Sequence, residues 1–114
     1  MPMVLYIVGT VPFLSAWQRS LHFTKHGHEF GAKNEFDYEA KAEAFMGAAM
    51  HPNMHECYRS TGTRDRCRID ANTRHFGVAF NVRTVRTYYI VTTAKIIRFG
   101  GADGYVRAQC AMTR

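Results

Sequence analysis

The sequence contains little cysteine and no cysteine pair at metal-binding or redox spacing. Cys57, Cys67 and Cys110 are the three cysteines in 114 residues, and no CxxC motif occurs. An odd number at wide spacing argues against a disulfide framework and is typical of reduced thiols in a cytosolic protein, although one bridge is compatible with it. Because Cys57 and Cys67 lack an activating motif, we interpret both as inert sheet residues.

Long hydrophobic runs are also missing. A transmembrane helix needs about 20 consecutive apolar residues, and the most apolar segment, MPMVLYIVGTVPFLSAW at the N-terminus, is interrupted by Pro12. No basic residue precedes that run, which disfavours a secretion signal. The segment instead predicts a first β-strand that stops at Gly9, and we expect no membrane span.

Acidic residues are scarce relative to basic ones. Nine Asp and Glu oppose 15 Lys and Arg, which gives a formal net charge of +6. All but four of the basic residues lie at or after position 59, and most are arginines, which bind phosphate in a bidentate manner. This balance favours a polyanionic partner, with nucleic acid ahead of an acidic protein or a membrane surface. Length and composition fit one folded domain over residues 1–114.

Helical periodicity indicates two helices in the first half of the chain. Phe13, Leu14, Trp17 and Leu21 recur at helical spacing, which predicts a helix from 13 to about 26 that ends at Gly27. A second helix is predicted over 34–50, with Asn34 as N-cap and Asp37 in a position like that of a capping box. Its expected apolar face comprises Tyr38, Ala42, Phe45, Met46, Ala49 and Met50.

The second half of the chain reads as strands and turns. Five segments are predicted as strands: ECYRST, RCRIDA, HFGVAFNV, RTYYIVTT and KIIRFGG. The tail ADGYVRAQCAMTR receives no assignment. Helices followed by strands, without βαβ alternation, predict an α+β fold in which N-terminal helices pack on a twisted, mostly antiparallel sheet of four to five strands.

Titratable residues cluster in LHFTKHGHEFG, residues 21–31. His22, Lys25 and His26 share one helix face in the last turn, where the negative end of the helix dipole favours a protonated imidazole. His28 lies beyond the predicted helix end, and we interpret it as a bystander.

Three interpretations of this cluster remain open. The spacing of His22 and His26, or of His51 and His55 with Cys57 nearby, supplies part of a metal site, but HEFGA lacks the second histidine of HExxH. The histidines also fit a polar helix end without chemistry. The third interpretation is RNA cleavage that needs no metal or other cofactor, in which a base, an acid and a cation act on the 2′-hydroxyl and the phosphate.

A second group of candidate residues lies in VRTVRTYYIV, residues 82–91. Strand alternation predicts Arg86, Tyr88 and Ile90 on one face and Val85, Thr87, Tyr89 and Val91 on the other. We expect Arg86 to bind phosphate and Tyr88 to stack on a base, with Arg68 joining that face from a neighbouring strand. Cross-strand aromatic packing is the alternative role for the tyrosines.

The order HFTKHGHEFG, FDYEAKAEAFM, RCRIDANTRHFGVAF and RTYYIV resembles a family of small ribonuclease toxins over about residues 20–92. The family comprises the C-terminal toxin domains of contact-dependent inhibition and polymorphic toxin systems, with prophage-type relatives, and is grouped with the barnase, EndoU, colicin and RelE ribonucleases. The resemblance implies a helical layer on an antiparallel sheet, hydrolysis of RNA, often tRNA, and a cognate immunity protein or antitoxin.

Transferred by position, the resemblance assigns the site residues. His26 becomes the general acid or base and His22 its partner, while Lys25 and Arg86 bind the phosphate; Thr87 and Tyr88 position the substrate, and Arg68 adds substrate binding. The resulting hypothesis is a metal-independent endoribonuclease toxin that acts in the cytoplasm, including that of a target cell into which it is delivered. The alternative is a non-catalytic module that binds RNA or inhibits a host factor on a nuclease-like fold.

Overall fold

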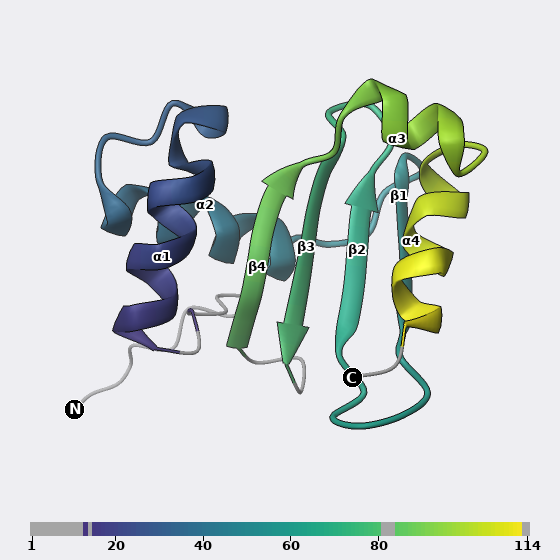
Figure 1. Ribbon diagram of the computed structural model, residues 1–114, viewed down its shortest axis with the longest axis horizontal. Coiled ribbons are helices and arrows are strands. Elements are labelled where there is room, and N and C mark those ends of the chain that lie inside the picture. Colours follow the sequence, from purple (N-terminus) through teal and green to yellow (C-terminus); the bar gives the residue numbers. More distant parts are fainter. Residues whose placement is uncertain (1–12, 14, 81–83, 113–114) are drawn as a thin grey trace.

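The computed structural model describes residues 13, 15–80 and 84–112, so the strand predicted near the N-terminus lies outside the described residues. Within them the fold is α+β, as predicted (Figure 1). The elements in chain order are α1 (Ala16–His26), a 3₁₀ turn η1 (Gly27–Phe30), α2 (Glu35–Gly47), β1 (Met54–Tyr58), β2 (Arg66–Asp70), β3 (His75–Phe80), β4 (Thr84–Ile90), α3 (Thr93–Arg98) and α4 (Ala102–Ala111).

The four strands form one antiparallel sheet in the order β1-β2-β3-β4, with helices on both faces. Helix α2 passes behind β3 and β4, α4 lies on the opposite face against β1 and β2, and α1 stands beside β4 (Figure 1). Each face has its own core. Tyr38, Phe45 and Met46 of α2 pack on Val85 and Tyr88, while Tyr105 and Val106 of α4 pack with Ile69, Phe76 and Val78.

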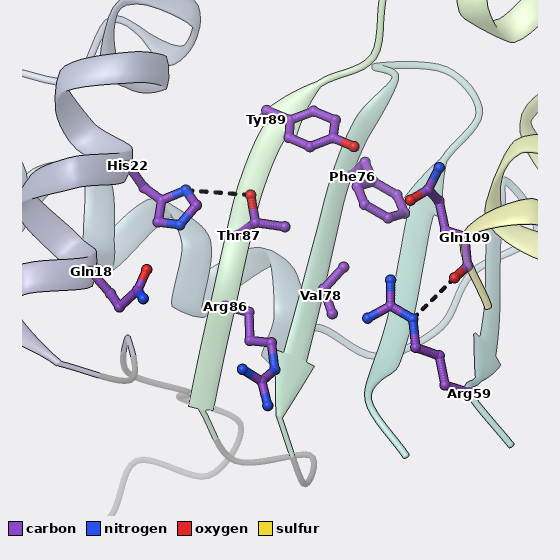
Figure 2. A pocket seen from close by; sticks show the side chains of 9 residues that line it. All are labelled: Gln18, His22, Arg59, Phe76, Val78, Arg86, Thr87, Tyr89 and Gln109. Atoms are coloured by element: carbon purple, nitrogen blue, oxygen red, sulfur yellow. Dashed lines mark hydrogen bonds between the residues drawn. The ribbon is translucent and has the colours of Figure 1, made fainter. Parts of the chain in front are cut away.

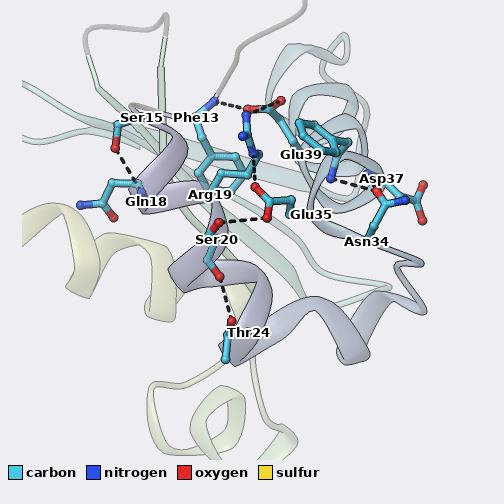
Figure 3. Close-up of polar contacts among 11 residues, drawn as sticks. Phe13, Ser15, Gln18, Arg19, Ser20, Thr24, Asn34, Glu35, Asp37 and Glu39 are labelled. Carbon is cyan, nitrogen blue, oxygen red and sulfur yellow. Dashed lines mark hydrogen bonds and ion pairs between the residues drawn. The ribbon is translucent and has the colours of Figure 1, made fainter.

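Helix α1 begins later than predicted and is held by polar contacts. Ser15 caps it by accepting a hydrogen bond from the Gln18 N–H. The expected apolar stripe is only partly core, because Phe13 before the helix is buried, whereas Trp17 is 72% exposed and Leu21 46% exposed. Instead, Arg19 and Ser20 bond the two carboxylate oxygens of Glu35 at 2.8 and 2.9 Å, which fixes α1 on α2 (Figure 3).

Gly27 does not end α1 in a left-handed conformation, contrary to the prediction. Its φ is −55°, and the chain continues as η1 until Gly31, whose φ of 63° makes the turn. Gly27 is needed for close packing, because an added Cβ would lie 2.4 Å from the Phe23 ring. The titratable cluster therefore extends without a break from α1 into η1.

Helix α2 matches its prediction at the start but is shorter at the end. The Asn34 side chain accepts from the N–H groups of Phe36 and Asp37, as expected for an N-cap. The Asp37 carboxylate accepts from Lys33 rather than Asn34. The helix stops at Gly47, so the last two residues assigned to its apolar face lie beyond it.

The C-terminal region departs most from the prediction. KIIRFGG belongs to α3 and the turn after it, because the Thr92 side chain caps a helix there and Gly100 and Gly101 adopt positive φ. The unassigned tail forms α4, which a disulfide between Cys57 and Cys110 ties to β1. The expectation of a reduced, inert Cys57 is thus wrong.

No helix in the described part of the chain combines the length and the apolar character that crossing a bilayer requires.

Candidate functional site

A pocket of about 290 Å³ opens on the part of the sheet that α4 leaves uncovered. Figure 2 shows its walls: α1 on one side, α4 and the end of β1 on the other, and the strands β3 and β4 between them. The described residues that line it are Gln18, His22, Arg59, Phe76, Val78, Arg86, Thr87, Tyr89 and Gln109.

A β-bulge brings Arg86 to this pocket. Thr87 pairs with Val78 and Val85 pairs with Ala79, so Arg86 is an extra residue on β4. An extra residue reverses the alternation of side chains across the bulge. Arg86 therefore faces the same side as Thr87 and Tyr89, and not the side of Tyr88 as predicted.

Tyr88 lies on the other face, where it belongs to the core under α2. It is 3% exposed, its ring stacks on Phe30 with centroids 4.1 Å apart, and its backbone carbonyl accepts a hydrogen bond from the Tyr38 hydroxyl. The predicted base-stacking role is not supported by this position, whereas the alternative of aromatic packing is.

His22 is the titratable side chain of α1 that reaches the pocket. Its Nδ1 lies 3.4 Å from the Thr87 Oγ1 (Figure 2). The ring also stacks on Phe13, with the ring centroids 5.9 Å apart. Partial burial lowers the pKa of His22, and electrostatic repulsion from His26, when that ring is protonated, and from Lys25 lowers it further. Both effects favour the neutral imidazole, which is the form able to accept a proton.

His26 lies behind His22 and not among the pocket-lining residues. The two rings are 6.3 Å apart, and the His26 Nδ1 contacts the Glu29 Oε2 at 2.6 Å. The other Glu29 oxygen accepts from the Ile90 N–H at 2.8 Å, which joins η1 to the end of β4. Lys25 is exposed on the same helix turn. The structure thus separates the three predicted residues and brings His22 alone to the pocket.

Two arginines supply positive charge at one end of the pocket by sharing a buried carboxylate. Asp65 is 2% exposed, and its Oδ2 lies 2.7 Å from the Arg86 Nε and 3.2 Å from the Arg59 Nη1. The Arg86 contact is an ion pair whose N–H is not aligned for a hydrogen bond. Two guanidinium groups against one carboxylate leave an excess positive charge, which suits one phosphate.

Arg59 is a site residue that the sequence did not reveal. Its Nε donates to the main-chain oxygen of Gln109 at 3.0 Å, so α4 orients it (Figure 2). Because α4 was not predicted, neither Gln109 nor its contact with Arg59 was expected. The signal available in the sequence was only the basic character of this half of the chain.

Arg68 does not join the site, contrary to the prediction. It is 4% exposed on the α2 face, where it donates to Glu56 at 2.6 Å and to the carbonyls of Phe45 and Ala48 at the end of α2. Strand alternation places Arg66 and Arg68 on this face and Cys67 and Ile69 on the other. Arg68 therefore binds the helix C-terminus.

The metal interpretation gains no support from the described residues. Among them, no three His, Cys, Asp or Glu side chains come together as a metal site would require. His51 contacts Asp70 at 3.4 Å, His55 contacts Asp103 at 3.6 Å, and Cys57 is disulfide-bonded.

Comparison with known proteins adds no assignment: no protein-family model matches the chain, and no similar sequence was found among curated proteins.

Proposed function

We propose that the protein is a metal-independent endoribonuclease whose general base is His22. The observation that carries the proposal is a half-buried histidine of lowered pKa that faces a pocket with two guanidinium groups. A base near neutrality and a cation for the phosphate are two of the groups that cleavage through the ribose 2′-hydroxyl requires.

Proton transfer begins at the nitrogen of His22 that points away from β4. If the Nδ1–H donates to Thr87, Nε2 carries the lone pair and is free to take the proton of the 2′-hydroxyl. The 2′-oxygen then attacks phosphorus, and the 5′-oxygen leaves with a proton returned by the imidazolium. The products are a 2′,3′-cyclic phosphate and a 5′-hydroxyl. Thr87 orients the His22 ring in this scheme.

Arg86 and Arg59 stabilise the charge that develops on the phosphorane. Asp65 fixes both guanidinium groups before substrate arrives, so little reorganisation is needed when the charge forms. Lys25 acts on His22 through its charge, and a direct proton transfer by His26 stays a prediction.

Several broader features of the proposal come from the resemblance alone. They are a tRNA substrate, action as a toxin in the cytoplasm and control by a cognate immunity protein. The excess of basic residues fits an RNA substrate but does not select one.

The test is incubation of the purified protein with total tRNA in EDTA. We expect cleavage that leaves cyclic phosphate ends, and loss of most of it in His22→Ala, because general base catalysis contributes about 10²–10⁴-fold. His28→Ala, which changes an exposed histidine outside the pocket, is the matched control. Equal cleavage by His22→Ala and the wild type would refute the mechanism. Salt-dependent RNA binding without cleavage would favour the non-catalytic module.

A further inference from the structure

The pocket has two chemically different ends (Figure 2). The guanidinium groups of Arg59 and Arg86 lie at one end, and the rings of Phe76 and Tyr89 lie at the other. Val78 of β3 lies between them. A ligand that fits both ends carries an anionic group on one side and a flat, weakly polar ring on the other.

The aromatic end presents ring surface and not a hydroxyl group. Phe76 and Tyr89 pack with centroids 5.2 Å apart, and the Tyr89 hydroxyl shares a hydrogen bond of 2.6 Å with the Tyr105 hydroxyl. Tyr89 remains half-buried and lines the pocket. Nucleobases are flat rings that pack on aromatic side chains, so this end is suited to a base.

The Gln109 side chain lies beside the Phe76 ring at this end (Figure 2). Its main-chain oxygen is the atom that accepts from Arg59, so the carboxamide itself is not used in that bond. A carboxamide offers one hydrogen-bond donor and one acceptor side by side, and this pair matches adenine best. Arginine side chains instead pair with guanine, and carboxylates accept a hydrogen bond from cytosine. The Arg86 guanidinium lies at the far end, the Arg59 guanidinium is held by Asp65 and the Gln109 main-chain oxygen, and no carboxylate lines the described pocket.

We infer that Phe76, Tyr89 and Gln109 form a base subsite that selects adenine, with the phosphate of the same nucleotide held by Arg59 and Arg86. The volume of about 290 Å³ is at the lower end for ligand pockets, which suits one nucleotide splayed out of a single strand and not a duplex. The inference rests on the proposed function in taking an RNA nucleotide as the ligand.

Equilibrium binding of the four nucleoside 3′-monophosphates, measured by calorimetry with ribose 5-phosphate as the baseless probe, tests the inference. We expect adenosine 3′-monophosphate to bind about tenfold more tightly than the other three and than ribose 5-phosphate, since a good bidentate base contact discriminates by about that factor. Similar affinities for all four nucleotides would overturn it, as would failure of all of them to bind.

Two variants of Gln109 make the test specific. Gln109→Leu retains the main-chain oxygen that orients Arg59, so it is expected to lose the adenine preference while its affinity for ribose 5-phosphate stays unchanged. Gln109→Glu, a second variant of similar size, is expected to lose adenine and favour cytidine 3′-monophosphate. Asn72→Leu removes an exposed carboxamide in the turn between β2 and β3, outside the pocket, and serves as the control, with the preference intact. A preference that survives both Gln109 variants would overturn the inference.

The outcomes separate this inference from the proposed function. Adenine-selective binding without RNA cleavage would remove the endoribonuclease proposal and leave the base subsite. Cleavage of tRNA with no preference for bonds that follow adenosine, and no selective mononucleotide binding, would remove the base subsite and leave the endoribonuclease.

Discussion

Replacing Cys57 and Cys110 together by serine is expected to destabilise the fold substantially. The disulfide joins residues 53 positions apart, and the chain-entropy relation for a loop of that size gives a loss of about 4 kcal/mol. Small domains are stable by about 5–15 kcal/mol, so the double variant retains only part of its stability. The effect is concentrated on α4, which the bridge attaches to β1.

Urea unfolding followed by far-ultraviolet circular dichroism measures this loss. With a slope of about 2 kcal/mol per molar urea, the midpoint is expected to fall by about 2 M. Reduction of the wild type should reproduce the same midpoint, because it removes the same cross-link, whereas the double variant should not respond to the reductant. The reasoning is refuted if oxidised wild type and double variant unfold at the same urea concentration, or if reduction leaves the wild type unchanged.

Two further predictions concern the histidines. Burial lowers the pKa values of both His22 and His75, so below about pH 6.5 the unfolded chain binds protons that the folded chain resists. The free energy of unfolding should therefore fall between pH 7.5 and 5.5, and a constant value in urea titrations would contradict this. Lys25→Met removes a positive charge near His22 and should raise the pKa of His22, which moves the acidic limb of the pH profile of RNA cleavage to higher pH. NMR titration of the His22 ring measures this pKa, and Lys33→Met serves as the control.

Much of the fold could be predicted because local signals and tertiary packing agree. Asn34 starts α2 as a cap, and Tyr38, Phe45 and Met46 are buried as their spacing indicated. The strands around Cys67 and Phe76 also lie within the segments RCRIDA and HFGVAFNV that were predicted as strands.

The C-terminal helices could not be predicted from the same signals. KIIRFGG is rich in β-branched residues, yet Thr92 caps a helix there and Ile97 remains 73% exposed. Strand propensity describes how well a side chain fits a half-buried pleated surface, and among the described residues no strand pairs with this segment.

The site was only partly predictable, because its geometry depends on contacts between distant segments. The histidine cluster and the RTYY segment were identified, but a helical wheel does not distinguish His22 from His26. Only the position of β4 beside α1 makes that distinction. The bulge at Arg86 is an insertion relative to β3, so it is defined by the pairing of two strands and leaves no local pattern.

Helix α1 and the residues that flank it also cover the β4 edge of the sheet. Along β4, Val85 forms a β-bridge with Phe13, Thr87 contacts His22, and the Ile90 N–H is bonded by Glu29. An uncovered edge strand is a template on which another chain can add a strand and aggregate. Helix α1, which carries the proposed general base His22, therefore also protects this edge of the sheet from pairing with another chain. Variants that loosen α1 are expected to become insoluble as well as inactive, so activity losses at this helix should be interpreted alongside the sedimentation behaviour of the same preparation.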